Sequence, residues 1–190
     1  MKQFLESQDL LQTISEEAEK NNARARQLVA NLSDAQLNWT PAPDSWSIAQ
    51  CLDHLALASE RFGPYLTKAI ARGREKRPAN GPVDYHPTRL GGWLIKQLEA
   101  TRKVPAPKVF RPSESSAIEN PLERFLQQQE KLLDFVGQAR RIDYNKTKLG
   151  SPVTPLMRYS LADAFVITVV HGQRHLAQAG RVLEAEGFPD

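Results

Sequence analysis

Apolar residues recur at helical spacing in four long segments of the chain. In the first, from Phe4 to Leu32, they return at the spacing of one helix face between Gln, Glu, Lys and Arg residues. This spacing predicts a long amphipathic helix with one buried stripe. After it, Pro41 and Pro43 favour an extended connection because proline cannot continue a helix.

The second segment opens with a helix-capping sequence. Ser47 followed by Gln50 matches the capping box, in which the serine oxygen accepts from the third helical amide and the glutamine reaches back to the cap amide. Trp46 before the cap and Cys51 after it occupy the positions of a hydrophobic staple. The cap therefore sets the phase of the second helix, and it places His54 beside the apolar face.

Residues 73–118 interrupt the helical pattern. They hold six of the 13 prolines of the chain and little sustained periodicity, which predicts a long connection over the surface. The second helix should end near Gly73, with a kink or a restart at Pro64, which has no amide hydrogen. Within the connection, apolar spacing predicts a short amphipathic helix from Thr88 to Ala100. Its apolar face should cover one end of the bundle or a partner subunit.

Two further long helices follow this connection. Asn120 as a cap and Pro121 at the first helical position open the third, which should stop around Arg140. A second loop over residues 143–158 leads to the last helix, which begins at a Ser-x-x-Asp cap and ends near Gly187. We find no internal repeat and no segment with the pattern of a strand. The chain is therefore expected to be an all-α four-helix bundle with a long crossover connection that carries a short extra helix.

Composition agrees with one soluble domain over residues 1–190. Hydrophobic residues make up 41% and charged residues 25%, and the net charge is only +3, so nothing indicates a nucleic-acid surface. No run approaches the ~20 apolar residues that span a bilayer, and the N-terminus lacks the apolar core of a secretory signal. The single cysteine, Cys51, fits a reducing compartment. A cytoplasmic protein without membrane contact is expected.

The last helix carries two histidines halfway along its apolar face. His171 and His175 are four residues apart, so they lie one turn above the other on the same side of the helix. Metalloproteases with this spacing have a general-base glutamate beside the first histidine, whereas here that neighbour is Gly172. A buried imidazole needs a polar partner, and a metal ion is one solution beside packing or a hydrogen bond.

His54 on the second helix supplies a third imidazole. Three histidines from two helices can give a divalent ion three nitrogen ligands and leave a position open for water or substrate. This is the catalytic pattern for zinc, and it also suits nickel or iron. A closed structural site would use four protein ligands, and a fourth is not evident. We therefore predict a metal site of His54, His171 and His175.

Several other residues are weaker candidates. Cys51 has the geometry to be a fourth ligand, but the staple explains it more simply, and His86 is interpreted as a solvated loop histidine rather than part of a lid. Arg174 and Gln178 lie close to the histidine face, where they either orient the ligands or make surface contacts. The basic run at residues 72–77 is interpreted as a solvated turn, with contact to an anionic substrate as the alternative.

At these residues the chain resembles a known family. The sequence Trp46-Ser47-Ile48-Ala49-Gln50 followed by His54-Leu55, together with His171-x-x-Arg174-His175-Leu176-Ala177-Gln178, is similar to the DinB/YfiT-type superfamily. The resemblance implies a four-helix bundle, a divalent metal held by the three histidines, and commonly a homodimer. Characterised relatives include S-transferases and isomerases that use low-molecular-weight thiols.

The expected function is accordingly a metal-dependent enzyme that acts on a small molecule, either a thiol S-transferase or a hydrolase. The alternative is a metal-binding stress or scaffold protein in which the site stabilises the bundle without turnover. A protein without metal, in which the histidines hydrogen-bond to each other or to carboxylates, is the third hypothesis.

Overall fold

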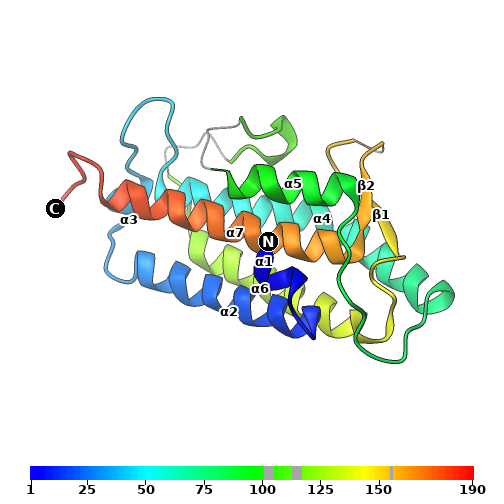
Figure 1. Ribbon diagram of the computed structural model, residues 1–190. Helices are drawn as coiled ribbons and strands as arrows, with labels where there is room; N and C mark the ends of the chain where they lie inside the picture. Colours follow the sequence, from blue (N-terminus) through cyan, green and yellow to red (C-terminus); the bar gives the residue numbers. More distant parts are fainter. Residues whose placement is uncertain (101–104, 113–116, 155) are drawn as a thin grey trace.

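The computed structural model describes residues 1–100, 105–112, 117–154 and 156–190, and four long helices dominate it (Figure 1). They are α2 (Leu10–Val29), α4 (Ile48–Lys76), α6 (Pro121–Gln138) and α7 (Leu161–Leu183). The predicted short helix in the crossover is α5 (Arg89–Glu99). The smaller elements are α1 (Lys2–Leu5), α3 (Asp34–Asn38), the 3-10 turns η1 (Lys108–Phe110) and η2 (Ala139–Arg141), and strands β1 (Lys148–Gly150) and β2 (Arg158–Ser160). The four-helix bundle with its crossover is thus confirmed.

The four long helices do not alternate up and down. Helices α4 and α6 run parallel. Two contacts show this: Asp53 pairs with Arg124 near the starts of the two helices, and Arg74 donates to Gln138 near their ends. Helices α2 and α7 run the opposite way, as the colour gradient in Figure 1 shows. The long crossover exists for this reason: it returns the chain from the end of α4 to the start of α6.

The hydrophobic core forms two clusters along the bundle. One cluster includes Ile14, Ile95 and Phe165, and the other includes Leu52, Phe125 and Leu176. On α7, the last residue of the first cluster is Val170 and the first residue of the second is Leu176. The predicted histidine positions of α7 therefore lie between the two apolar clusters.

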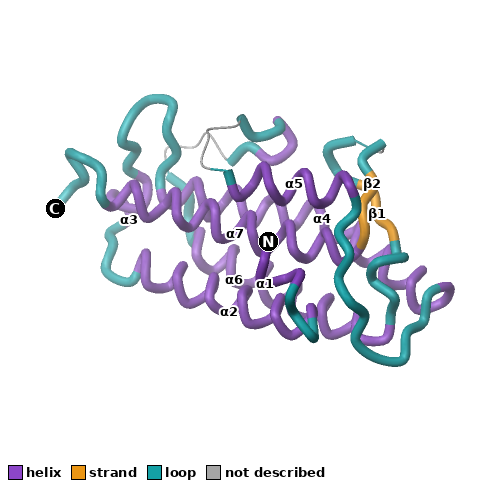
Figure 2. The backbone as a smooth tube through the Cα atoms, viewed as in Figure 1, coloured by secondary structure: helices purple, strands orange, loops and turns teal. Residues whose placement is uncertain are grey.

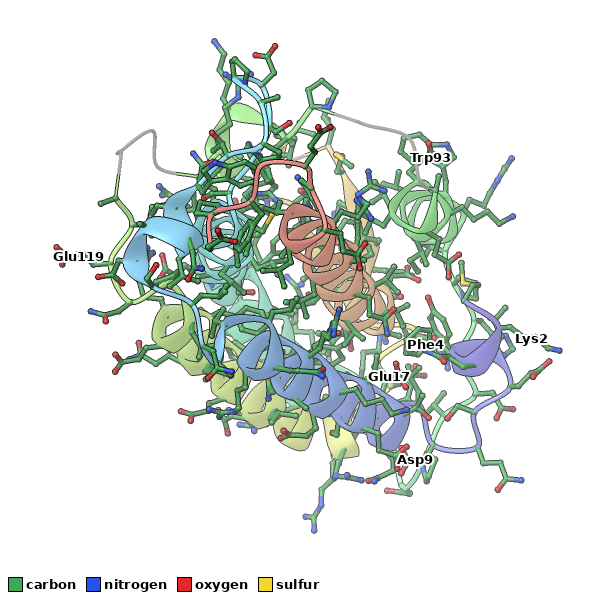
Figure 3. All side chains as sticks on the ribbon, turned by 90° about the vertical axis from the view of Figure 1, so that its left-hand side faces the viewer. Lys2, Phe4, Asp9, Glu17, Trp93 and Glu119 are labelled. Atoms are coloured by element: carbon green, nitrogen blue, oxygen red, sulfur yellow. The ribbon has the colours of Figure 1, made fainter. Side chains whose placement is uncertain are left out.

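The apolar face of α5 covers α7 of the same chain. Ile95 is completely buried in the first cluster, and Leu90, Leu94 and Leu98 pack against it. Figure 3 views the bundle end-on and shows α5 beside it, with Trp93 on this short helix. Two roles were predicted for this face, and in the structure it covers the bundle itself, against α7.

Helix α7 holds α5 at both of its ends. At the start, the buried carboxylate of Asp163 accepts from the Tyr85 hydroxyl at 2.8 Å and from the Thr88 hydroxyl at 2.7 Å. At the end, the Arg174 guanidinium donates to the carbonyls of Leu98 and Ala100, which are the free acceptors of a helix C-terminus. The crossover is therefore anchored to the helix that carries two of the histidines.

The predicted helix from Phe4 to Leu32 is two helices. Helix α2 begins after Asp9, which caps it: the Asp9 carboxylate accepts from the Gln12 amide at 3.1 Å. This cap separates α2 from α1. The side chain of Phe4 on the separate α1 is completely buried in the first cluster, so burial of this ring fixes α1. The periodicity was correct, but it could not distinguish one helix from two that share an apolar face.

Helix α4 continues through Pro64 without a restart and ends at Lys76, three residues beyond the predicted Gly73. Its contacts with α6 and α7 stabilise the helix on both sides of the proline, and packing of this kind overrides local propensity. Gly63 before the proline also has no Cβ to crowd the proline ring.

The ends of the last two helices also differ from prediction. Helix α7 ends at Leu183, before Gly187, because the tail turns back and the ring of Phe188 packs edge-on against Trp39 at 5.5 Å. Asn120 stands at the predicted cap of α6 in a left-handed conformation, with φ of 49° and no side-chain cap bond.

A small antiparallel hairpin was missed. Strands β1 and β2 pair with Leu149 opposite Tyr159, and both side chains are buried (Figure 2). Three residues are too few to show strand alternation, so these strands left no readable signal. Among the described helices, none is long and apolar enough to cross a membrane.

Candidate metal centre

The structure brings His54, His171 and His175 together. One potential ligand nitrogen from each lies within 4.8 Å of the others, and the Nε2 atoms of His54 and His171 are 3.0 Å apart. Ring centroids are separated by 4.5 to 4.8 Å in all three pairs. The capping box at Ser47 forms as predicted and phases α4 so that His54 faces α7.

Two outer partners orient the imidazole rings. The Nδ1–H of His54 donates to the carbonyl of Phe110 at 2.6 Å, and the Nδ1–H of His175 donates to Gln178 Oε1 at 3.0 Å. With Nδ1 protonated, each ring turns the lone pair of Nε2 toward the other histidines. Hydrogen bonds of this kind are the usual support for metal-binding histidines.

Desolvation favours the neutral form of all three rings. Desolvation lowers the pKa of His175 to about 3 and that of His171 well below its usual value, and the neighbouring histidines lower both further. Desolvation also lowers the pKa of His54, although the hydrogen bond to Phe110 and the charge of Asp53 oppose it. Neutral imidazole is the form that binds a metal ion, so the site is ready for one at neutral pH.

The indole of Trp46 forms one wall of the centre. It lies 4.8 Å from the ring of His54 and 5.5 Å from the ring of His175, nearly parallel to the latter. Its place before the cap predicted only a staple role, so this contact with two candidate ligands is new. His54 and His175 are buried, whereas His171 is partly exposed.

The donor set fits a divalent ion. Three neutral imidazole nitrogens lie within 4.8 Å of one another, and three nitrogen donors leave one position of a four-coordinate ion for a further ligand. The 3.0 Å contact between His54 and His171 also matches a hydrogen bond, donated by Nε2–H of His171. In the metal-free protein this bond pairs the two Nε2 atoms, and an ion bound there would displace the proton between them.

Two other predicted candidates lie outside this centre. Among the described residues, the cluster includes neither Cys51 nor His86. Cys51 is fully buried in the second apolar cluster, and burial raises the pKa of its thiol to about 12, so it stays protonated. His86 is exposed, and its backbone amide donates to Asn145. Both observations agree with the simpler interpretation of these residues.

The remaining candidates divide by position. Gln178 orients His175, whereas Arg174 turns to the carbonyls at the end of α5. The basic run begins at Arg72, 18 residues after His54 on α4, which corresponds to about 27 Å along the helix. Arg72 donates to the Lys148 carbonyl of β1. The run therefore lies far from the histidines, where it cannot contact a substrate bound to them.

Sequence reasoning missed Phe110 as a partner of the centre. The group that contacts His54 is the backbone carbonyl of Phe110, which every residue type has, so the residue type carries no signal. Phe110 also lies in the proline-rich connection after α5. No periodicity relates this segment to His54, which is 56 residues earlier. Only the path of the crossover places it there.

We expect the metal-free protein to lose stability as the pH falls from 7 to 5. A histidine in the unfolded chain has a pKa near 6.5, whereas the folded pKa of His175 is about 3, so the unfolded state binds more protons between these values. His175 alone should lower the free energy of unfolding by about 2 kcal/mol over this range. Urea unfolding in the presence of EDTA at both pH values measures the loss.

Two variants provide the controls for this pH dependence. His175→Gln should flatten it, because the variant lacks one group that must stay neutral. His86→Gln removes an exposed histidine and should leave it unchanged. An equal loss of stability in His175→Gln and in the wild type would contradict the assignment.

Comparison with known proteins gives a family and a fold. The chain matches the DinB superfamily over residues 17–179, a span that includes all three histidines. It is similar in structure to YfiT from Bacillus subtilis, described as a probable metal-dependent hydrolase with an unusual four-helix bundle topology. The TM-score is 0.63 at 18% identity, over 96% of this chain and 91% of that chain. This likeness shows a shared fold. A comparison with curated proteins gave no match.

Proposed function

Because the chain belongs to the DinB superfamily, we propose that it is a metal-dependent enzyme whose divalent ion is held by His54, His171 and His175. The observation that carries the proposal is the convergence of three neutral imidazoles, two of them oriented by outer hydrogen bonds. Zinc or nickel suits these nitrogen donors best, with iron as the third candidate.

The reaction we propose is hydrolysis of a small molecule. When bound, a divalent ion on three imidazoles lowers the pKa of a coordinated water and polarises a carbonyl. In hydrolysis the water oxygen bonds to the acyl carbon, the bond to the leaving group breaks, and the leaving group takes a proton. The description of YfiT as a probable metal-dependent hydrolase supports this choice over other reaction types.

The residues of this chain have distinct parts in such a reaction. The Phe110 carbonyl and Gln178 hold the rings of His54 and His175 in place, so the ligands need not reorganise. Trp46 covers one side of the centre and limits the entry of water there. The partly exposed side at His171 is left for the substrate.

Transfer of a thiol is the second reaction we consider. The thiol of Cys51 is buried and stays protonated, so the sulfur nucleophile would come from a low-molecular-weight thiol as a second substrate. Parallel assays of an ester or amide with and without such a thiol distinguish the two reactions. A homodimer and a cytoplasmic location stay predictions from the resemblance and from the sequence.

Chelation should separate an enzyme from a structural metal protein. For an enzyme we expect at least a 100-fold loss of hydrolysis of ester and amide substrates after EDTA treatment, with recovery when zinc or nickel is added. The melting temperature should change little, because the bundle has two apolar clusters of its own. A large fall in melting temperature without activity in any hydrolytic or thiol assay would support the structural role instead.

A further inference from the structure

A groove of about 270 Å³ lies between α4 and α6, outside the three-histidine centre. Aromatic and aliphatic side chains form most of its wall, and polar groups lie among them. The residues that matter for its chemistry are Glu60, Phe62, Gly63, Leu132, Phe135 and Thr168. This volume is sufficient for an aromatic ring or a short branched chain with a polar linker.

The groove is close to the candidate metal centre along two helices. Thr168 precedes His171 by one turn of α7, and Ser59 in the groove follows His54 by about 7.5 Å along α4. Phe110 connects the two sites directly. Its ring stacks on Phe62 of the groove at 5.9 Å, while its carbonyl accepts from His54. A molecule in the groove therefore lies beside the support of one proposed ligand.

Glu60 gives the groove a hydrogen-bond acceptor. Glu60 lines the groove, and an ionised carboxylate has about four lone-pair sites, so it can accept an N–H beside the contacts of 3.5 Å that it makes with Arg124 and Gln128. Gly63 adds space, since a Cβ at this position would meet no atom within 4 Å. Glu60 and Gly63 thus combine an acceptor with an unfilled volume.

The charges around the groove nearly balance. The Glu60 carboxylate is contacted by Arg124 and by Gln128, both at 3.5 Å, and Lys131 lies on the opposite wall. A strongly charged ligand would meet a like charge on one side. A neutral ligand with an apolar body and an N–H donor matches the wall and the Glu60 acceptor.

We propose that this groove binds the non-reacting end of the substrate, an aryl or short branched alkyl group that carries a neutral N–H. The proposal rests on the function proposed above. Glu60 lies about 9 Å from His54 along α4, so the N–H and the scissile carbonyl are separated by a similar distance. An extended amide or ester of roughly dipeptide length meets this requirement, since an extended residue spans about 3.3–3.6 Å.

The test uses N-benzylacetamide as the probe and the full chain as the protein. Two-dimensional NMR titration should show binding to the wild type, with shifts at groove residues such as Gly63 and Thr168. Gly63→Leu fills the groove and should weaken binding at least tenfold. Gly63→Ala is the matched control, because it places the same strain before Pro64 but leaves the volume open, and it should bind the probe as the wild type does.

A second probe keeps the test independent of how the variants fold. N-benzyl-N-methylacetamide lacks the N–H and should bind the wild type at least fivefold more weakly. Equal affinities for the two probes, unchanged affinity in Gly63→Leu, or no binding to the wild type would each overturn the proposal. Since His171→Ala leaves the groove intact, it should still bind N-benzylacetamide. If the wild type itself holds no metal, the proposed function fails, and retained binding of N-benzylacetamide leaves the groove as a binding site.

Discussion

Replacement of His171 by alanine is expected to abolish metal binding. The wild type, purified without a nickel column, should hold about one divalent ion per chain. The variant keeps only two of the three nitrogen ligands, and we expect its affinity to fall roughly 1000-fold. Elemental analysis of both proteins by mass spectrometry, followed by zinc titration of the apo forms, measures the effect.

His86→Ala is the control for this experiment. It removes a histidine that is exposed in the crossover and lies outside the cluster, so metal content should equal that of the wild type. Absence of metal from the wild type, or equal metal content in His171→Ala, would refute the site. Either result would favour the hydrogen-bonded form, in which Nε2 of His171 donates to Nε2 of His54 at 3.0 Å.

Gly91→Ala should destabilise the fold by about 2–4 kcal/mol. A Cβ at this position would stand 2.2 Å from Cγ of Asp163, whose carboxylate is completely buried and already accepts from Tyr85 and Thr88. The methyl group must therefore push α5 away from α7 or break this buried network, and both are costly. The midpoint of urea unfolding, monitored by circular dichroism, gives the loss.

The neighbouring glycine offers a matched control. At Gly92 a Cβ would lie 3.6 Å from Pro87, which is ordinary van der Waals contact. Because alanine favours a helix over glycine, Gly92→Ala should be neutral or stabilise the protein by up to about 1 kcal/mol. Equal effects of the two substitutions would show that α5 is not held closely against Asp163.

The anchoring of α5 has a consequence for the candidate centre. Arg174, between the two histidines of α7, donates to the end of α5, and Asp163 on the same helix holds its start. The same crossover supplies the Phe110 carbonyl to His54. The long connection therefore both returns the chain to the start of α6 and supports the proposed ligands.

The sequence alone was sufficient to find the four long helices and to name the three candidate ligands. Capping boxes at Ser47 and Ser160 are local, since each needs only residues three positions apart, and the structure contains both. The spacing of His171 and His175 is local in the same sense, because helix geometry places residues four apart on one face. His54 could be added because the cap at Ser47 phases its helix.

Tertiary structure decided what depends on contacts between distant segments. Packing against α6 and α7 keeps α4 helical on both sides of Pro64, and burial of Phe4 fixes α1 as a helix separate from α2. The two three-residue strands are stable only because they pair with each other. The approach of His54 to the α7 histidines, the Phe110 carbonyl and the groove likewise depend on how the helices assemble. Local patterns encode which face of a helix is buried, but the free energy that selects its neighbours comes from packing over the whole bundle.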